Sequence, residues 1–313
     1  MIEVKNLTKR YGNHTAVDHL SFCIPQGQIF GFLGPNGAGK STTMNIMTGC
    51  LAASEGQVTI GGYDIYAQAD KAKKLMGYLP EQPPLYMDRT PREYLVFVAR
   101  AKKIPAKQIG KEVARVMKLT KIVDVADRLI RHLSKGYCQR VGIAQAILGD
   151  PQIIILDEPT VGLDPIQIVE IRDLIRKLGK DHTVILSSHI LSEVQAVCNQ
   201  VMIIANGKLL ACDTPANLEQ QYASTVTIDL TVEADSQFVE SMLVKISQQH
   251  TIVKQFQGRT QAQIRTQKGQ EDAICRQIFQ ACRDANSPIL CMNVNTPSLE
   301  DIFIQLTQAK EGA

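Results

Sequence analysis

The stretch that most constrains the fold of this chain is "GPNGAGKST" at residues 34–42. It contains the pattern G-x-x-x-x-G-K-[ST], which carries meaning when a strand precedes it and a helix follows it. Both are predicted here, because the apolar run "QIFGFL" comes before the stretch and the helical pattern "TTMNIMTG" overlaps its end. Glycines let backbone N–H groups point inward around a phosphate, and the helix N-terminus adds positive potential. The stretch therefore predicts an α/β fold that binds a nucleoside triphosphate.

Every residue of this loop is a candidate nucleotide contact. Lys40 is expected to reach the outer phosphates, and Ser41 is expected to ligate Mg²⁺. The full candidate set is Gly34, Pro35, Asn36, Gly37, Ala38, Gly39, Lys40, Ser41 and Thr42.

Two further apolar runs, "QIIILDE" and "TVILSSH", read as buried strands that end in polar residues. The carboxyl ends of such strands meet at the ligand-binding edge of an open α/β sheet. Asp157 at the first strand end suits Mg²⁺, through water, and the adjacent Glu158 suits a general base acting on the attacking water. His189 at the second strand end is placed to bind the γ-phosphate or hold the water, although a histidine of this kind also serves as a structural hydrogen bonder.

The order of predicted elements divides the chain into two domains, as expected for 313 residues. Residues 1–220 alternate strands and helices, with a helical insertion at about 83–150 that is opened by prolines and ends before "IIILDE". Residues 225–307 read as strand, helix, strand, strand, helix and strand, followed by a last helix. This βαββαβ order predicts a small accessory α+β domain of the ferredoxin-like kind.

Composition excludes several classes of function. The net charge is +3 without a basic patch, so no nucleic-acid partner is expected. The eight cysteines contain no CxxC pair, which predicts buried free thiols rather than a metal site. No stretch reaches the roughly 20 apolar residues of a membrane helix, so we expect a soluble chain that acts at a membrane only through a partner.

These motifs, in this order and spacing, resemble the nucleotide-binding subunit of ATP-binding cassette (ABC) transporters over about residues 1–220. "GPNGAGKST" is similar to the Walker A motif of that family, "IIILDE" to its Walker B with the adjoining glutamate, and "GLDP" at 162–165, with Asp164, to its D-loop. His189 matches the switch histidine. Tyr11 matches the aromatic residue that stacks on adenine. The resemblance implies a P-loop NTPase cassette with a mixed sheet core, ATP and Mg²⁺ as cofactors, and ATP hydrolysis.

The segment "LSKGY" lies where this family has its LSGGQ signature. The resemblance implies that Ser134, Lys135, Gly136 and Tyr137 contact the ATP held by a partner cassette, which requires a homodimer or a paired cassette. Ser134 offers a hydroxyl and Gly136 an unobstructed N–H at a helix start. Lys135 departs from the family glycine and is expected either to face solvent or to add positive charge near the partner's phosphates. Tyr137 replaces the family glutamine.

The Q-loop region, "GYLPEQPPLY", also departs from the family pattern, and either Glu81 or Gln82 occupies the glutamine position. Residues 83–97 follow it and are the candidate contact with a membrane subunit, lined by Tyr86, Tyr94 and Phe97. Together with "SLEDIFIQLT" near the C-terminus, these features resemble cassettes of ABC-2 type exporters.

The resemblance therefore implies an ATPase subunit that powers transport, in the export direction, through an integral-membrane permease. Its implied location is the cytoplasmic face of the inner or plasma membrane. The alternative is a soluble ABC ATPase that acts on a macromolecular complex; it is disfavoured by the single P-loop and the absence of sustained heptads.

Overall fold

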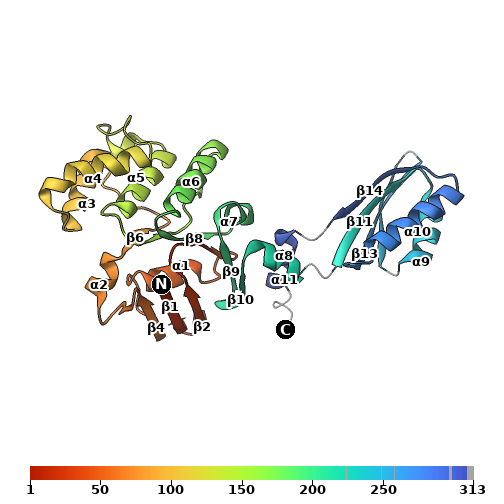
Figure 1. Ribbon diagram of the computed structural model, residues 1–313, viewed down its shortest axis with the longest axis horizontal. Helices are drawn as coiled ribbons and strands as arrows, with labels where there is room; N and C mark the ends of the chain where they lie inside the picture. The colour runs from red at the N-terminus through yellow and green to blue at the C-terminus, as the bar shows by residue number, and fades with distance from the viewer. Residues whose placement is uncertain (223–224, 248, 257, 296–297, 309–313) are drawn as a thin grey trace. The chain divides into compact units, whose positions relative to one another are not determined.

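A computed structural model describes residues 1–222, 225–247, 249–256, 258–295 and 298–308. The chain divides into two compact units, residues 1–215 and 216–313 (Figure 1). No helix among the described residues is long and apolar enough to cross a membrane.

The first unit is built on two sheets. The central sheet has the strand order β10-β9-β3-β8-β7-β6, in which only β10 is antiparallel to its neighbour. Its strands are β3 (Ile29–Leu33), β6 (Met76–Leu79), β7 (Ile153–Leu156), β8 (Thr183–Ser188), β9 (Gln200–Ala205) and β10 (Lys208–Asp213). The second sheet is antiparallel, in the order β2-β1-β4-β5. Its strands are β1 (Ile2–Tyr11), β2 (His14–Ile24), β4 (Glu55–Ile60) and β5 (Tyr63–Asp64).

The core of this unit lies between the two sheets. Alternate side chains of the central strands, such as Phe30, Phe32 and Ile155, pack against the antiparallel sheet and helix α1 (Lys40–Met47). In β3, β7 and β8 the side chains of the opposite face are also buried, because these strands carry helices on that face. Gly31 shows how close this packing is, since a Cβ there would lie 2.5 Å from a side-chain atom of Val194 in α7 (Leu191–Val197).

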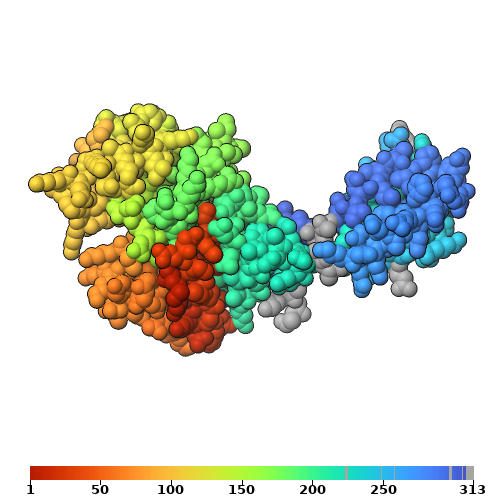
Figure 2. Space-filling view, viewed as in Figure 1, coloured from red at the N-terminus to blue at the C-terminus, as the bar shows by residue number. Residues whose placement is uncertain are grey.

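The helices between β6 and β7 form the predicted insertion, a lobe coloured yellow in Figure 2. Their bounds are α3 (Pro91–Ala101), α4 (Ala106–Leu119), a short 3₁₀ turn (Ile130–His132) and α5 (Lys135–Ile147). Helix α3 begins with a capping box, in which Thr90 and Glu93 bind each other's backbone N–H. The predicted insertion is not helical throughout, because α4 ends at Leu119 and Lys121 adopts the left-handed conformation at φ 56°.

Two more helices complete the first unit: α2 (Ala69–Lys74) precedes β6, and α6 (Pro165–Leu178) connects β7 to β8. Helix α6 buries Ile171, Leu174, Ile175 and Leu178, whereas Ile168 is half-buried. Helix α8 (Pro215–Tyr222) follows β10 and begins at the last residue of the first unit.

The second unit has the element order that the sequence predicts: β11 (Thr225–Val232), α9 (Ser236–Ile246), β12 (His250–Phe256), β13 (Arg259–Gln267), α10 (Glu271–Asp284) and β14 (Ile289–Asn295), then α11 (Leu299–Gln308). Its antiparallel sheet has the order β12-β13-β11-β14. Alternate residues of β11 face a separate core that includes Ile228, Leu230 and Leu243. The unit therefore has a hydrophobic core of its own.

The cysteines differ from the prediction in their burial. All eight are free, but Cys198 and Cys282 alone are buried. The prediction of buried thiols is wrong for Cys23, Cys50, Cys212 and Cys291, which are exposed, whereas Cys138 in α5 and Cys275 in α10 are half-buried, because composition does not tell which face of an element a cysteine occupies. No group of three or more metal-ligating side chains occurs among the described residues.

Candidate functional site

The glycine-rich loop connects β3 to α1, as its motif predicts. Gly34 has no room for a side chain, because a Cβ there would lie 2.3 Å from the carbonyl oxygen of Ile204. Gly39 is the N-cap of α1 at φ 100°, a conformation that a side chain strains, and a Cβ would also lie 2.4 Å from the Ala16 carbonyl oxygen. Gly37 has a positive φ of 80° as well. These backbone angles curve the loop around the start of α1.

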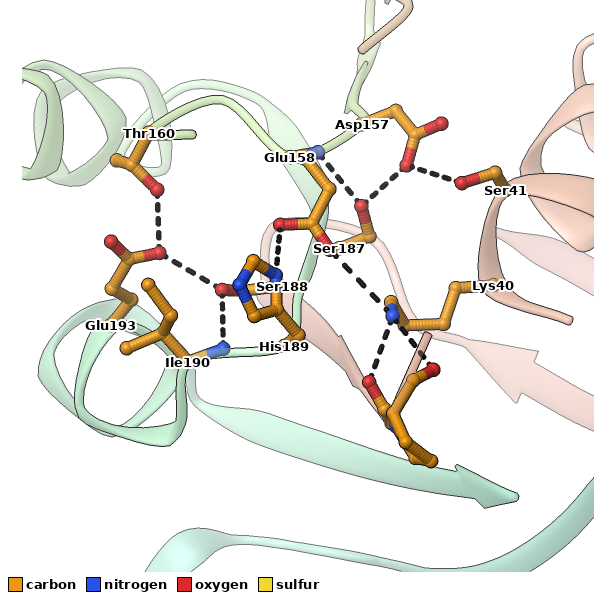
Figure 3. A network of polar contacts seen from close by, with 12 residues as sticks. Lys40, Ser41, Asp157, Glu158, Thr160, Ser187, Ser188, His189, Ile190 and Glu193 are labelled. Carbon is orange, nitrogen blue, oxygen red and sulfur yellow. Dashed lines mark hydrogen bonds and ion pairs between the residues drawn. The ribbon is translucent and has the colours of Figure 1, made fainter. Parts of the chain in front are cut away.

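Lys40 is the buried cation of the site, with 5 % of its surface exposed. Its Nζ donates to the carbonyl oxygens of Gly34 (2.8 Å) and Pro35 (3.2 Å) and lies 3.6 Å from Glu158 Oε1 (Figure 3). Burial lowers the pKa of Lys40, and the carboxylates of Glu158 and Asp157 oppose that shift. An anion placed in the loop would offer this ammonium a better partner than two carbonyls.

Asp157 lies directly after β7 and is 2 % exposed. Its Oδ1 accepts hydrogen bonds from Ser41 Oγ at 3.2 Å and from Ser187 Oγ at 2.6 Å. Ser187 Oγ in turn accepts from the backbone N–H of Glu158 at 2.8 Å. The polar ends of α1, β7 and β8 therefore meet at one point of the sheet edge, as the strand pattern predicts.

Glu158 is 6 % exposed and has a φ of 49°, which is uncommon for a residue with a side chain. Its Oε2 lies 3.0 Å from His189 Nδ1, so the carboxylate is held between an imidazole and the Lys40 ammonium. A strained backbone conformation of this kind is typical of functional sites, where surrounding contacts maintain it. Here the contacts come from Ser187 and His189.

These residues surround a cavity of about 580 Å³. Its lining is Tyr11, His14, Ala16, Asn36, Gly37, Ala38, Gly39, Lys40, Ser41, Thr42, Glu81, Glu158, Val161 and His189. Tyr11 is 49 % exposed at the end of β1, with Lys9 Nζ 5.1 Å from its ring centroid. The volume suits a nucleotide.

Of the two candidates at the Q-loop position, Glu81 lines the cavity and Gln82 does not. The Glu81 carboxylate also acts on Lys40, since its charge favours the ammonium form. The geometry therefore favours Glu81 as the residue that approaches the bound nucleotide.

The donor set fits Mg²⁺. Ser41 and Asp157 supply one hydroxyl and one carboxylate, 3.2 Å apart, beside a loop suited to phosphates. Magnesium in phosphate sites takes one or two protein ligands and completes its octahedron with phosphate oxygens and water. Ser41 and Asp157 would hold the ion in this arrangement.

The signature segment lies away from this cavity, and none of its four candidate residues lines it. Ser134 is the N-cap of α5, where its hydroxyl accepts from the Tyr137 N–H at 3.4 Å. Tyr137 Oη donates to Asp124 Oδ2 at 2.6 Å, and this bond raises the pKa of Tyr137. Gly136 faces Gln167, since a Cβ on Gly136 would lie 2.3 Å from that side chain.

Lys135 and Asp164 both belong to contacts near the D-loop. Lys135 is exposed, but its Nζ lies beside Gly162, at 2.2 Å from the place of a Cβ there. Asp164 is the N-cap of α6 and accepts from the Gln167 N–H at 2.9 Å. Lys135 is thus exposed to solvent, as one of its two expectations has it, with its ammonium beside Gly162 of its own chain.

The aromatic surface predicted at 83–97 is only partly correct. Tyr86 and Phe97 are 48 % and 49 % exposed, with ring centroids 5.2 Å apart. Tyr94 is 3 % exposed and its hydroxyl donates to Gln145, so it belongs to the core of the insertion. The exposed aromatic pair is Tyr86 and Phe97.

Four side chains of the polar network were not predicted. Thr160 follows Glu158 by two residues, Ser187 and Ser188 precede His189, and Glu193 lies in α7; all four are buried. The hydroxyls of "SSH" were a visible signal, because serine at a buried strand end needs a partner. Nothing in the residue spacing singles out Glu193.

The chain is similar in sequence to a known family of proteins. The sequence profile of the family described as "ABC transporter" matches residues 17–161. The uncharacterised ABC transporter ATP-binding protein YhcH of Bacillus subtilis (strain 168) is 36 % identical, over 98 % of this chain and 96 % of its own length. The bacitracin transport ATP-binding protein BcrA of Bacillus licheniformis is 34 % identical, over 98 % and 97 %.

A solved structure extends the comparison to the fold. It is described as the dimeric structure of a post-hydrolysis state of the ATP-binding cassette MJ0796 bound to ADP and Pi. It is 25 % identical to this chain, covers 68 % of it and 98 % of its own length, and has a TM-score of 0.63. The covered share is close to the share of the chain that the first unit holds, 215 of 313 residues.

Proposed function

This chain belongs to the ATP-binding proteins of ABC transporters, and from that premise we propose that it binds ATP, hydrolyses it and powers export through a separate membrane subunit. One observation carries the proposal. Three separate segments supply Lys40 and Ser41, Asp157 and Glu158, and His189; all but Asp157 line one cavity at the edge of the central sheet, and Asp157 accepts a hydrogen bond from Ser41 beside it (Figure 3).

Each residue of the site has a role in hydrolysis that follows from its position. The loop N–H groups and Lys40 bind the phosphates, and the adenine stacks on Tyr11 at the exposed end of β1. Glu158 Oε2 takes the proton of the attacking water, because it is a buried carboxylate oxygen beside the place of the terminal phosphate. His189 orients that carboxylate by donating its Nδ1–H across 3.0 Å, and its other nitrogen then accepts a hydrogen bond from the attacking water.

Ser41 and Asp157 hold Mg²⁺ with the nucleotide. When bound, the ion would neutralise part of the negative charge on the phosphate oxygens. Glu81, which lines the same cavity, approaches the nucleotide from the Q-loop.

The active assembly is a homodimer with two ATP molecules. Two observations support this part of the proposal. The signature residues from Ser134 to Tyr137 lie outside the cavity of their own chain, at the start of a 13-residue helix whose N-terminus favours an anion. The similar cassette MJ0796 is described as dimeric. In the dimer, Ser134 and Gly136 contact the γ-phosphate bound by the partner subunit, and Lys135 leaves Gly162 to add a positive charge there.

The membrane subunit contacts the first unit at residues 83–97, where Tyr86 and Phe97 expose an apolar pair. In this proposal the protein is peripheral, at the cytoplasmic face of the membrane. Similarity to the bacitracin transport protein BcrA over nearly the whole chain supports a role in transport. That this transport is export of the ABC-2 type is part of the proposal. The βαββαβ unit, with its sheet order β12-β13-β11-β14, is an accessory domain that we class as ferredoxin-like.

The proposal is tested by phosphate release from purified wild-type protein beside Glu158→Gln and Lys40→Ala. We expect wild-type turnover, a loss of about 10²- to 10⁴-fold in Glu158→Gln with ATP still bound, and no ATP binding in Lys40→Ala. Glu233→Gln, at an exposed carboxylate of the second unit, is the matched control and should turn over normally. Full activity of Glu158→Gln, or normal affinity of Lys40→Ala, would show that the site is assigned wrongly.

A further inference from the structure

Glu193 is a buried carboxylate that the proposed chemistry does not use. It is the third residue of α7 and is 4 % exposed. Its Oε2 accepts a hydrogen bond from Thr160 Oγ1 at 2.5 Å and another from Ser188 Oγ at 2.9 Å (Figure 3). Its Oε1 is also buried and has no hydrogen-bond partner within the described parts of the chain. One oxygen therefore bridges two hydroxyls.

The bridge connects the two segments that carry the reacting side chains. Thr160 follows Glu158 by two residues, and Ser188 directly precedes His189. Ser188 Oγ also accepts a hydrogen bond from the Ile190 N–H at 3.0 Å. The residues directly before and after His189 are therefore bonded to each other. Glu193 thus links the main chain after β7 to the main chain after β8.

A second link joins the same two segments closer to the sheet. There Ser187 Oγ binds Asp157 and the Glu158 N–H. The contact between Glu158 Oε2 and His189 Nδ1 involves the residues next to both links. The Ser187 link alone leaves the backbone at His189 free to turn relative to the segment after β7. The second link, through Glu193, restricts that movement.

The identity of the side chain also needs a reason. Burial of a carboxylate costs free energy, and two hydroxyl donors to one oxygen offset only part of that cost. A purely structural contact between α7 and the strands could be made by apolar packing at lower cost. An acceptor for both hydroxyls is what an apolar residue cannot supply.

We propose that Glu193 is a positioning residue of the ATPase site. Its carboxylate holds Thr160 and Ser188 together and thereby keeps His189 aimed at Glu158. The inference rests on the proposed function, since this alignment matters only if Glu158 and His189 act on ATP. Glu193 acts through an oxygen that accepts hydrogen bonds from Thr160 and Ser188, and its negative charge is not required.

Hydrogen–deuterium exchange tests the bridge without nucleotide. Peptides that cover 158–164 and 186–191 should exchange faster in Glu193→Ala than in wild type. Exchange in Glu193→Gln should stay close to wild type, because the amide oxygen accepts both hydroxyl bonds. Ser192→Ala, at an exposed position of the same helix, is the matched control. Unchanged exchange of both peptides in Glu193→Ala would overturn the proposal.

Kinetics test the consequence. We expect Glu193→Ala to lose at least tenfold in kcat with little change in the KM for ATP, and Glu193→Gln to retain most of kcat with the pH profile of wild type. In His189→Ala, the further change Glu193→Ala should cost little, because the alignment it serves is already gone. A residue that only stabilises the fold would lower the activity of His189→Ala by the same factor as that of wild type. That multiplicative result, or a shifted pH profile in Glu193→Gln, would refute a positioning role.

The two arms separate this proposal from the proposed function. If wild-type protein does not hydrolyse ATP, the proposed function fails, and the positioning role fails with it even if the exchange experiment finds the bridge. If wild type hydrolyses ATP and Glu193→Ala keeps its kcat, the proposed function stands and the role of Glu193 is wrong.

Discussion

The change Ser187→Ala removes the hydroxyl that holds Asp157 and Glu158 together. Ser187 is fully buried, donates to Asp157 Oδ1 at 2.6 Å and accepts from the Glu158 N–H at 2.8 Å. Alanine is close to serine in volume, so the variant leaves no appreciable cavity. The effect should come from hydrogen bonding alone.

Its magnitude follows from the two groups that lose their partner. A hydrogen bond to a charged acceptor contributes about 1.5–3 kcal/mol, and a buried N–H left without a partner costs about 1–3 kcal/mol. The two losses share one site and do not add fully, so we expect the free energy of unfolding of the first unit to fall by about 2–4 kcal/mol. For a unit of this size, that is roughly 5–15 °C in Tm.

Thermal unfolding followed by circular dichroism, with ATP turnover on the same samples, measures the effect. Ser241→Ala is the matched control: its hydroxyl lies on the exposed face of α9, bonded to the Phe238 carbonyl, and its loss should change stability by less than about 0.5 kcal/mol. The variant should also turn over ATP more slowly, because the left-handed backbone of Glu158 loses the bond that maintains it. Equal stability of Ser187→Ala and Ser241→Ala would refute this reasoning.

Three other predictions follow from the geometry. Tyr11→Ala should weaken ATP binding by about 1–3 kcal/mol, about 5- to 150-fold in Kd, and a Kd within twofold of wild type by fluorescence titration would contradict the stacking role. Glu81→Ala should lower kcat while Gln82→Ala should not, because Glu81 alone of the two lines the cavity; the reverse order in steady-state assays would reassign the Q-loop residue. Lys102 donates to three carbonyl oxygens at the end of α5, and burial lowers its pKa to about 8 from the unfolded value near 10.5. Between pH 8 and 10.5 the folded state therefore binds fewer protons than the unfolded state. Wild type should therefore gain stability relative to Lys102→Met as pH rises from 8 to 10.5 in urea unfolding, and parallel curves would argue against the shift.

The positions of the chemistry-bearing residues could be predicted because short-range patterns determine them. A strand followed by glycines and a helix places Lys40 and Ser41, and an apolar run that stops at a carboxylate places Asp157 and Glu158 at a strand end. Parallel strands then bring these ends to one edge of the sheet. The helix starts at Ser134 and Asp164 could be predicted equally well, because a side chain that caps a helix bonds a backbone N–H only a few residues further along the chain.

The connecting residues could not be predicted in the same way. Ser187 meets Asp157 because β7 and β8 pair in a register that sets Leu156 beside Leu186, and no sequence pattern specifies that register. Glu193 meets Thr160 only after α7 packs on the sheet. Side-chain direction set the other limits: Tyr94 turned inward, and Lys135 folded onto Gly162.

The central claim is that ATP joins two copies of this chain through the signature segment. Light-scattering mass of Glu158→Gln protein, with and without magnesium ATP, tests it beside the same protein that also carries Ser134→Arg. ATP should double the mass of Glu158→Gln, and Ser134→Arg should prevent the doubling. A mass that ATP leaves unchanged, or a dimer that forms equally well with Ser134→Arg, would contradict it.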